Sequence, residues 1–254
     1  MPLETLPRIP RKGASASSLR CYSRVMIEWR PDGDVRAVAA IVHDYKLPSA
    51  CWQRFGMALS ARGIAVYALE FRGARRIDDL GDDAATLIST SRDREPSRPI
   101  FLLGHGQGAV AACLHVLANP SPLNGLVCAS IPLELRLHDF VLRCIRWMAP
   151  LAPGSAALVR ANDLLRASAP RLSLPLLVLH GSADSVSRPS GSEYLHKHAG
   201  SCDKTLVIFE GYHHDLFNDS ARDLVVEKIC QWIDARLFAT DHGARIGIEY
   251  INKE

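Results

Sequence analysis

A short glycine-rich turn is the first place in the sequence where chemistry could be organised. Gly104-His105-Gly106-Gln107-Gly108 follows an apolar strand pattern and precedes a run of small helix-forming residues. This is the frame G-x-S-x-G of a nucleophile elbow, whose glycines allow a tight strand-to-helix turn and whose helix N-terminus stabilises negative charge. Gly106 holds the central position and has no side chain with which to attack. A phosphate-binding or purely structural turn stays open, although neither G-x-G-x-x-G spacing nor a P-loop lysine is present.

Two further side chains follow later strand patterns and could form an acid-base pair. Asp184 comes just after LPLLVLHG, and His214 comes just after TLVIFEG. In this chain order, nucleophile position, acid and base, the aspartate would orient the imidazole and the histidine would move the proton. Taken alone, each has a plainer interpretation, as a turn aspartate or a structural histidine.

An early loop could complete the site with backbone donors. Val42-His43-Asp44-Tyr45 follows the apolar run AVAAIV. A loop in this place usually lends one N–H group to an oxyanion hole, and the residue after the nucleophile, here Gln107, lends the second.

The elements that must position these residues alternate regularly. Short apolar runs, each suited to a strand buried on both faces, are separated by helical patterns. The expected strands cover residues 21–29, 35–43, 64–71, 99–105, 123–132, 174–181 and 205–211. This alternation predicts an α/β fold with a mostly parallel sheet flanked by helices. Ligands of such sheets bind beyond the carboxyl ends of the strands, where all of the residues above lie.

The alternation of strand and helix patterns also predicts the domain organisation. Residues 1–20 are expected to be an irregular tail, residues 21–240 a single domain, and residues 241–254 a C-terminal extension. The helical stretch 133–173 interrupts the alternation between two core strands, where such a sheet usually carries an inserted cap, and we predict a short helical cap there.

Composition excludes several classes of function. The net charge of +3 is small, and no aromatic residues are interleaved with the N-terminal arginines, so nucleic-acid binding is not predicted. No apolar run is long enough for a membrane helix, and no signal peptide is visible. Neither His196 and His198 nor the acidic cluster at 78–83 has metal-ligand spacing, so we predict no metal and no cofactor.

Cysteine usage indicates the compartment. The seven cysteines are odd in number, show no C-x-x-C spacing, and several lie in apolar runs such as AVAACLHVLA. Free buried cysteine behaves as a small hydrophobe, so the pattern favours a reducing, cytoplasmic location.

Taken together, these segments resemble the monoacylglycerol-lipase-like (lysophospholipase, serine aminopeptidase-like) branch of the α/β-hydrolases. The family patterns GHSMGG, P.L..HG..D.V and G..H.L.NE correspond to LLGHGQGA, LPLLVLHGSADSV and EGYHHDLFND, and the similarity covers residues 35–237. The resemblance implies an α/β-hydrolase fold and ester or acylglycerol hydrolysis. It makes Asp184 the triad acid and His214 the triad base, and it makes Tyr45 and Gln107 the backbone donors of the oxyanion hole.

The departures from the family are as informative as the matches. The family's serine is Gly106, and the glycine of its early HG motif is Asp44, whose carboxylate should oppose an oxyanion. Several losses together favour natural divergence over a single serine replaced by design.

Three functions stay open at this point. The chain could be an esterase- or lipase-type hydrolase that is inactive or strongly impaired because its nucleophile is lost. It could be a non-catalytic protein that binds a small apolar ligand, an ester-type ligand or a partner protein. It could also use His214 and Asp184 as a general base without covalent catalysis, with a gap beside Gly106 holding a water or a substrate hydroxyl. The sequence does not determine the oligomeric state.

Overall fold

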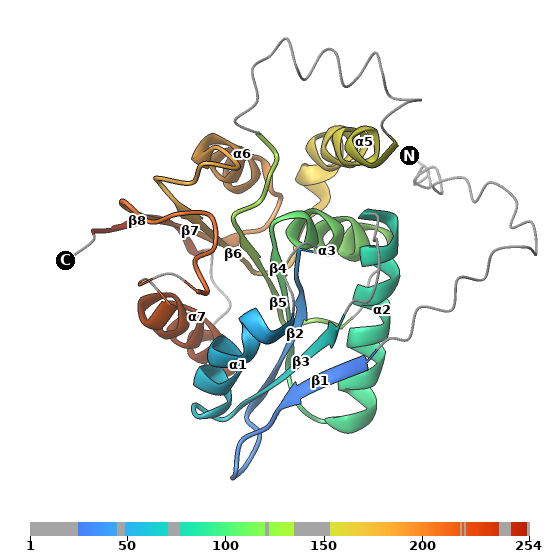
Figure 1. Cartoon of the computed structure of the whole chain (residues 1–254), viewed down its shortest axis with the longest axis vertical. Coiled ribbons are helices and arrows are strands. Elements are labelled where there is room, and N and C mark those ends of the chain that lie inside the picture. The colour runs from blue at the N-terminus through green and yellow to red at the C-terminus, as the bar shows by residue number, and fades with distance from the viewer. Residues whose placement is uncertain are drawn as a thin grey trace, which may run out of the picture.

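Eight strands form one sheet in the computed structural model, which describes residues 25–44, 49–70, 77–119, 122–134, 153–218, 220, 222–238 and 245–252. The spatial order is β1-β3-β2-β4-β5-β6-β7-β8 (Figure 1). Only β1 and β3 pair antiparallel, and every other neighbouring pair runs parallel. The strands are β1 (Val25–Trp29), β2 (Ala37–Val42), β3 (Ile64–Glu70), β4 (Ile100–His105), β5 (Gly125–Ala129), β6 (Leu176–Gly181), β7 (Asp203–Phe209) and β8 (Arg245–Ile251).

Helices cover both faces of the sheet, as the alternating pattern predicts. They are η1 (Ser49–Trp52), α1 (Gln53–Ser60), α2 (Ile77–Arg94), α3 (Gln107–Ala118), α5 (Pro153–Ser168), η2 (Ala169–Arg171), α6 (Pro189–His198) and α7 (Arg222–Leu237). Helices α1 and α7 pack on one face, while α2, α3, α5 and α6 lie on the other (Figure 1).

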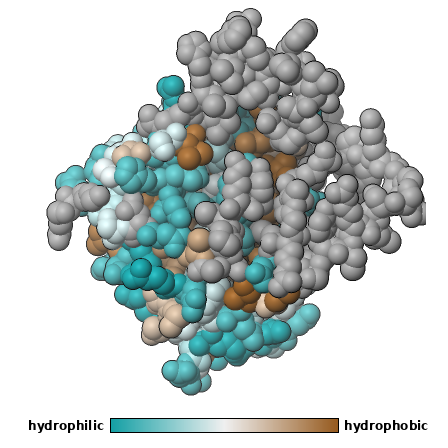
Figure 2. Space-filling model, viewed as in Figure 1, coloured by the Kyte–Doolittle hydropathy of each residue, from teal (hydrophilic) through white to brown (hydrophobic). Residues whose placement is uncertain are grey.

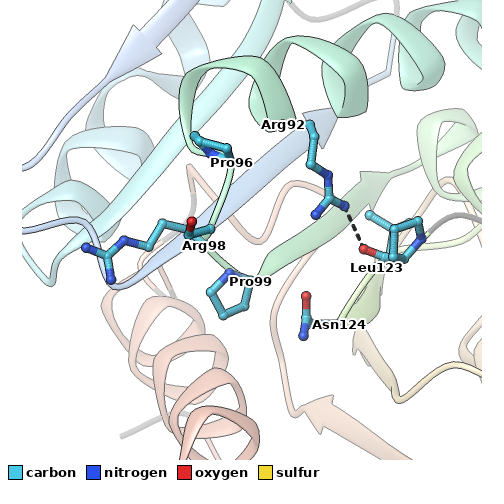
Figure 3. A pocket seen from close by; sticks show the side chains of 8 residues that line it. Arg92, Pro96, Arg98, Pro99, Leu123 and Asn124 are labelled. Carbon is cyan, nitrogen blue, oxygen red and sulfur yellow. Dashed lines mark hydrogen bonds between the residues drawn. The ribbon is translucent and has the colours of Figure 1, made fainter.

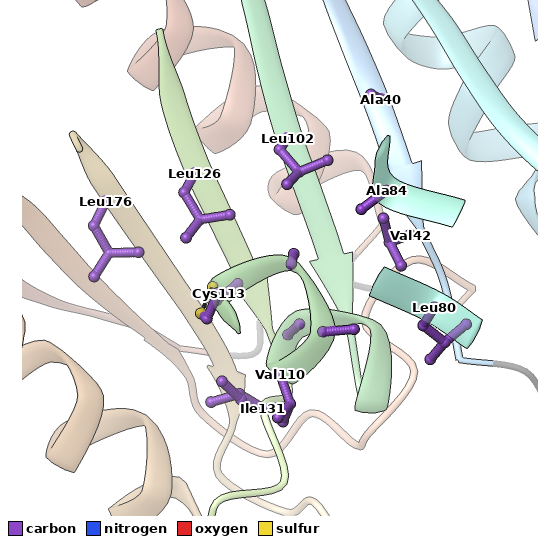
Figure 4. Packing of buried hydrophobic residues seen from close by; sticks show 14 of the residues in the cluster. Ala40, Val42, Leu80, Ala84, Leu102, Val110, Cys113, Leu126, Ile131 and Leu176 are labelled. Atoms are coloured by element: carbon purple, nitrogen blue, oxygen red, sulfur yellow. Dashed lines mark hydrogen bonds between the residues drawn. The ribbon is translucent and has the colours of Figure 1, made fainter. Parts of the chain in front are cut away.

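Each central strand contributes to two cores, which explains its continuous apolar sequence. In β2, Val38, Ala40 and Val42 face the core shared with α2 and α3, while Ala37, Ala39 and Ile41 face the core shared with α1 and α7. Figure 4 shows the first core, where Val110 and Cys113 of α3 lie against the leucines of the neighbouring strands. Because side chains alternate along a strand, burial on both faces requires apolar residues at every position.

Two elements lie within the expected cap and the expected C-terminal extension. Within the expected cap, 153–168 is helical as α5 and packs against α3 and α2, whereas 135–152 lies outside the described residues. The expected C-terminal extension contains β8, which continues the main sheet beyond β7. The fold therefore extends past residue 240. The expected tail at 1–20 lies outside the described residues.

No helix in the described part of the chain is both long enough and apolar enough to cross a bilayer.

Candidate active site

The turn between β4 and α3 has the geometry of a strand-to-helix elbow. Gly106 is the N-cap of α3 and has φ 56° and ψ −126°, a conformation that favours glycine. A Cβ on Gly104 would lie 2.4 Å from Ala109 Cα, and a Cβ on Gly108 would lie 2.0 Å from Val42 O. The flanking glycines are therefore required by close backbone packing, and Gln107 is the first residue of α3.

The carboxylate of Asp44 lies at the centre of this elbow. A Cβ built on Gly106 would be 2.8 Å from Asp44 Oδ2 and 3.3 Å from Asp44 Cβ. The general-base hypothesis allows a gap beside Gly106 that could hold a water or a substrate hydroxyl, and the structure places the Asp44 side chain next to Gly106. Asp44 reaches this point because it follows β2, whose carboxyl end lies next to that of β4 in the sheet. Its backbone carbonyl also lies 2.9 Å from Nδ1 of the buried His43.

Asp184 and His214 meet at the same sheet edge. His214 Nδ1 lies 2.7 Å from Asp184 Oδ2. Because a carboxylate only accepts hydrogen bonds, Nδ1 carries a proton, and a neutral ring would then have a lone pair on Nε2 that can accept a hydrogen bond. The geometry is that of an imidazole oriented by a buried acid, which is suited to general-base chemistry.

The surroundings of Asp184 hold it ionised. Its Oδ1 accepts hydrogen bonds from the backbone N–H groups of Val186 and Ser187, at 2.7 and 2.9 Å, and Ser187 Oγ donates to Oδ2 at 2.8 Å. His180 Nε2 is 3.2 Å from Oδ2, within ion-pair distance but outside hydrogen-bond geometry. Burial by itself would raise the pKa of Asp184. The contacts with His180, His214 and Ser187 outweigh that effect and hold the pKa well below its ordinary value.

Two residues that the sequence reasoning did not single out fix the position of His214. Ser130 Oγ donates to the carbonyl oxygen of His214 at 2.6 Å, and His105 Nε2 lies 3.2 Å from the same oxygen. Both residues adjoin the elbow. His105 directly precedes Gly106, and the residue before Ser130, Ala129, accepts a hydrogen bond from the N–H of Gly106 at 3.0 Å. Ser130 has a positive φ of 50°, and its position just after β5 was the one available signal.

His105 is buried beneath the elbow as a neutral imidazole. Its ring contacts those of Trp52, His214 and Phe217. Burial, with a smaller contribution from His214, lowers the pKa of His105 to about 4. His105 Nε2 therefore donates to the His214 carbonyl without adding positive charge to the site.

This burial predicts an early loss of stability in acid. A histidine whose pKa is about 6.5 in the unfolded chain and about 4 in the folded chain contributes stability above pH 6.5 that is lost as the pH falls toward 4. Urea unfolding between pH 7 and pH 4 should show a loss on the order of 3 kcal/mol in this window, reduced in His105→Gln. If the unfolding free energy fell equally steeply with pH in the two proteins, His105 would not be held neutral in the folded chain.

The remaining predicted positions are placed as follows. Tyr45 lies outside the described residues. His213, the neighbour of His214, has Nδ1 3.2 Å from Ala183 O, and Tyr212 is buried in the core near α7. In the described part of the chain, no cluster of three or more His, Cys, Asp or Glu side chains could hold a metal ion.

A surface hollow of about 330 Å³ lies at the opposite, amino ends of β4 and β5 (Figure 3). Arg92 Nη2 donates to Pro122 O there at 2.7 Å, and the Arg98 side chain points away from Asn124. This hollow is separate from the elbow and brings none of the site residues together.

Comparisons with known proteins show which sequences and structures the chain is similar to. A family model described as serine aminopeptidase, S33, matches residues 33–163 and 152–221. The chain is 24% identical to a monoacylglycerol lipase of Mycolicibacterium smegmatis, over 82% of this chain and 92% of that protein. It is 25% identical to the human monoglyceride lipase, over 82% and 86% of the two chains.

Solved structures show the same fold. The crystal structure of Paleococcus ferrophilus monoacylglycerol lipase superposes with a TM-score of 0.71 at 19% identity, covering 84% of this chain and 99% of that one. A soluble variant of the Saccharomyces cerevisiae monoglyceride lipase, in complex with a substrate analogue, gives 0.72 at 15% identity, covering 86% and 94%. The mostly parallel sheet with its flanking helices is thus the α/β-hydrolase fold.

Proposed function

Because the chain belongs to the serine aminopeptidase S33 family of α/β-hydrolases, whose members include esterase- and lipase-type enzymes, we propose that it keeps an ester-hydrolase pocket but forms no acyl-enzyme. In this proposal Gly106 stands at the nucleophile position. Asp184 is the acid that orients the imidazole, and His214 is the base. Tyr45 and Gln107 provide the backbone N–H groups of the oxyanion hole.

The Asp44 carboxylate at the elbow is the observation that carries this proposal. Acyl transfer needs an alkoxide-like oxygen and then an oxyanion at this point, both negatively charged. Two unit charges about 4 Å apart repel by about 4 kcal/mol at an effective dielectric of about 20. The missing serine hydroxyl at Gly106 and the carboxylate of Asp44 therefore both act against covalent ester hydrolysis.

The names of similar proteins support a proposal for the ligand class. Proteins similar to this chain include a monoacylglycerol lipase and a caffeoylshikimate esterase, and both names denote hydrolysis of carboxylic esters. We therefore propose a small apolar or ester-type ligand, with no role in nucleic-acid binding. On the cysteine pattern, in which Cys113 and Cys128 are buried free thiols, we place the protein in the cytoplasm.

A second candidate rests on the intact acid-base pair. Asp184 is fully buried and accepts hydrogen bonds from backbone and hydroxyl donors, and His214 is held by both its ring and its carbonyl. Such a pair can remove a proton from a water or a substrate hydroxyl without covalent catalysis. The proposal of a purely binding protein gives this ordered pair no role.

Labelling and turnover of the unmodified chain distinguish these candidates. A fluorophosphonate probe should leave the intact mass unchanged, and short p-nitrophenyl and monoacylglycerol esters should be hydrolysed no faster than by His214→Ala. Ester turnover that is blocked by the probe would refute the proposal, because inhibition by a fluorophosphonate requires a reactive serine. Turnover that resists the probe and disappears in His214→Ala would establish the general-base candidate.

A further inference from the structure

Strand β8 leaves one edge of the sheet open for pairing. It pairs with β7, and in the described part of the chain no segment pairs with its other side. The N–H of Arg245 donates to Cys202 O, and Ile251 O accepts from the N–H of Glu210, each at 2.8 Å. Because backbone direction alternates along a strand, Ile246, Ile248 and Tyr250 point their N–H and C=O groups to the open edge. This edge is at the left of the sheet in Figure 1.

The same three residues expose their side chains on one face of β8. Ile246 is 63% exposed, Ile248 is 53% exposed and Tyr250 is 63% exposed. Helix α7 covers the opposite face. There Lys228 of α7 pairs with Glu249 at 2.6 Å, and Arg245 donates to Ala235 O at 3.2 Å. Three large apolar side chains beside unpaired backbone groups are unusual on an edge strand, because such an edge readily pairs with another strand.

We propose that β8 of a second copy of this chain occupies this edge, antiparallel and related by a two-fold axis at Ile248. In this register Ile248 lies opposite its own symmetry mate, and Ile246 lies opposite Tyr250 of the second copy. All of these are residues whose backbone groups point outward, so each opposed pair can exchange both hydrogen bonds. The two exposed apolar stripes become one continuous face.

The charges on the covered face fit the same register. Arg245 becomes a diagonal neighbour of Glu249 of the second copy, and the two-fold axis repeats that contact. Long side chains reach across such diagonals, and opposite charges there are favourable. A two-fold interface must be self-complementary, and the segment RIGIEYI meets this requirement in hydrogen bonding, apolar contact and charge. A lipid surface would bury the apolar stripe but leave the edge N–H and C=O groups unpaired.

The oligomeric state of the full chain tests this interface. Sedimentation velocity across the micromolar range should show the unmodified chain as a concentration-dependent dimer. Ile248→Pro removes an N–H that faces outward and should leave the β7–β8 pairing in place, so this variant should be a folded monomer. Ile248→Lys should also be monomeric. Met57→Lys, at an exposed position on α1, is the matched control and should remain dimeric.

A charge exchange tests the register. Arg245→Glu should raise the dimer Kd by several-fold to about tenfold, because it places like charges across the diagonal. Arg245→Glu/Glu249→Arg should restore the affinity. A monomeric unmodified chain at every soluble concentration would overturn the proposal, as would equal loss of the dimer in Met57→Lys. Binding of the monomer to phosphatidylcholine vesicles, lost in Ile248→Lys, would assign the stripe to a lipid surface instead.

Discussion

Gly106→Ser combined with Asp44→Gly should give this chain measurable ester hydrolysis, whereas Gly106→Ser alone should give little. The serine would stand on the existing elbow, with φ near the 56° that Gly106 adopts, next to His105, whose ring contacts that of His214. Its Cβ would lie 2.8 Å from Asp44 Oδ2, so the carboxylate must move aside and would still repel the oxyanion. The glycine at position 44 removes both obstacles.

The expected difference between the two variants is large. Repulsion of about 4 kcal/mol corresponds to a factor on the order of 10³ in rate, since about 1.4 kcal/mol is tenfold. We expect kcat/KM for p-nitrophenyl butyrate to be roughly 10² to 10³ higher in the double variant than in Gly106→Ser. Active-site titration with a fluorophosphonate should give stoichiometric labelling of the double variant only.

Two further variants identify how Asp44 opposes ester hydrolysis and whether the gain in activity depends on His214. Gly106→Ser/Asp44→Asn keeps nearly the volume of the aspartate and removes its charge, so it separates electrostatic repulsion from steric obstruction. Adding His214→Ala to the active double variant should remove the gain, because the serine then has no base. Equal rates for Gly106→Ser and the double variant would show that Asp44 does not oppose acyl transfer. A folded, inactive double variant would contradict the proposed role of Gly106.

Gly108→Ala should lower the free energy of unfolding more than the alanine substitution of any other glycine at the elbow. The added Cβ would lie 2.0 Å from Val42 O, 2.7 Å from Val42 C and 3.1 Å from His43 C. These are backbone atoms of β2 and the residue after it, which cannot rotate away. Relieving the overlap requires α3 to move from the sheet, and we expect a loss of about 3 kcal/mol or more in unfolding free energy.

Gly81→Ala is the control for this substitution. Gly81 lies inside α2, and a Cβ there meets no atom within 4 Å. Alanine should therefore stabilise the protein by about 0.5 to 1 kcal/mol through its helix propensity. Urea unfolding of both variants measures the contrast. A Gly108→Ala variant as stable as the unmodified chain would mean that β2 and α3 are not in contact at this point.

Much of the site could be predicted because it depends on chain order. Apolar runs of strand length alternating with helical patterns predict a parallel sheet, and in such a sheet the ends of all parallel strands share one edge. Asp184 and His214 each follow such a run, so their proximity at 2.7 Å follows from topology together with the turn each occupies. The glycines beside Gly106 follow in the same way from the tight turn between strand and helix.

The sequence alone determined the fold class, the strands that carry the site, and which chemical groups stand at their ends. Only the tertiary structure decided where the Asp44 side chain lies, that Ser130 and His105 hold the His214 carbonyl, and that β8 completes the sheet. The physical reason is that local periodicity reports burial and backbone conformation. The direction of a side chain across a gap between loops, and the pairing of an edge strand, depend on contacts between segments far apart in the chain.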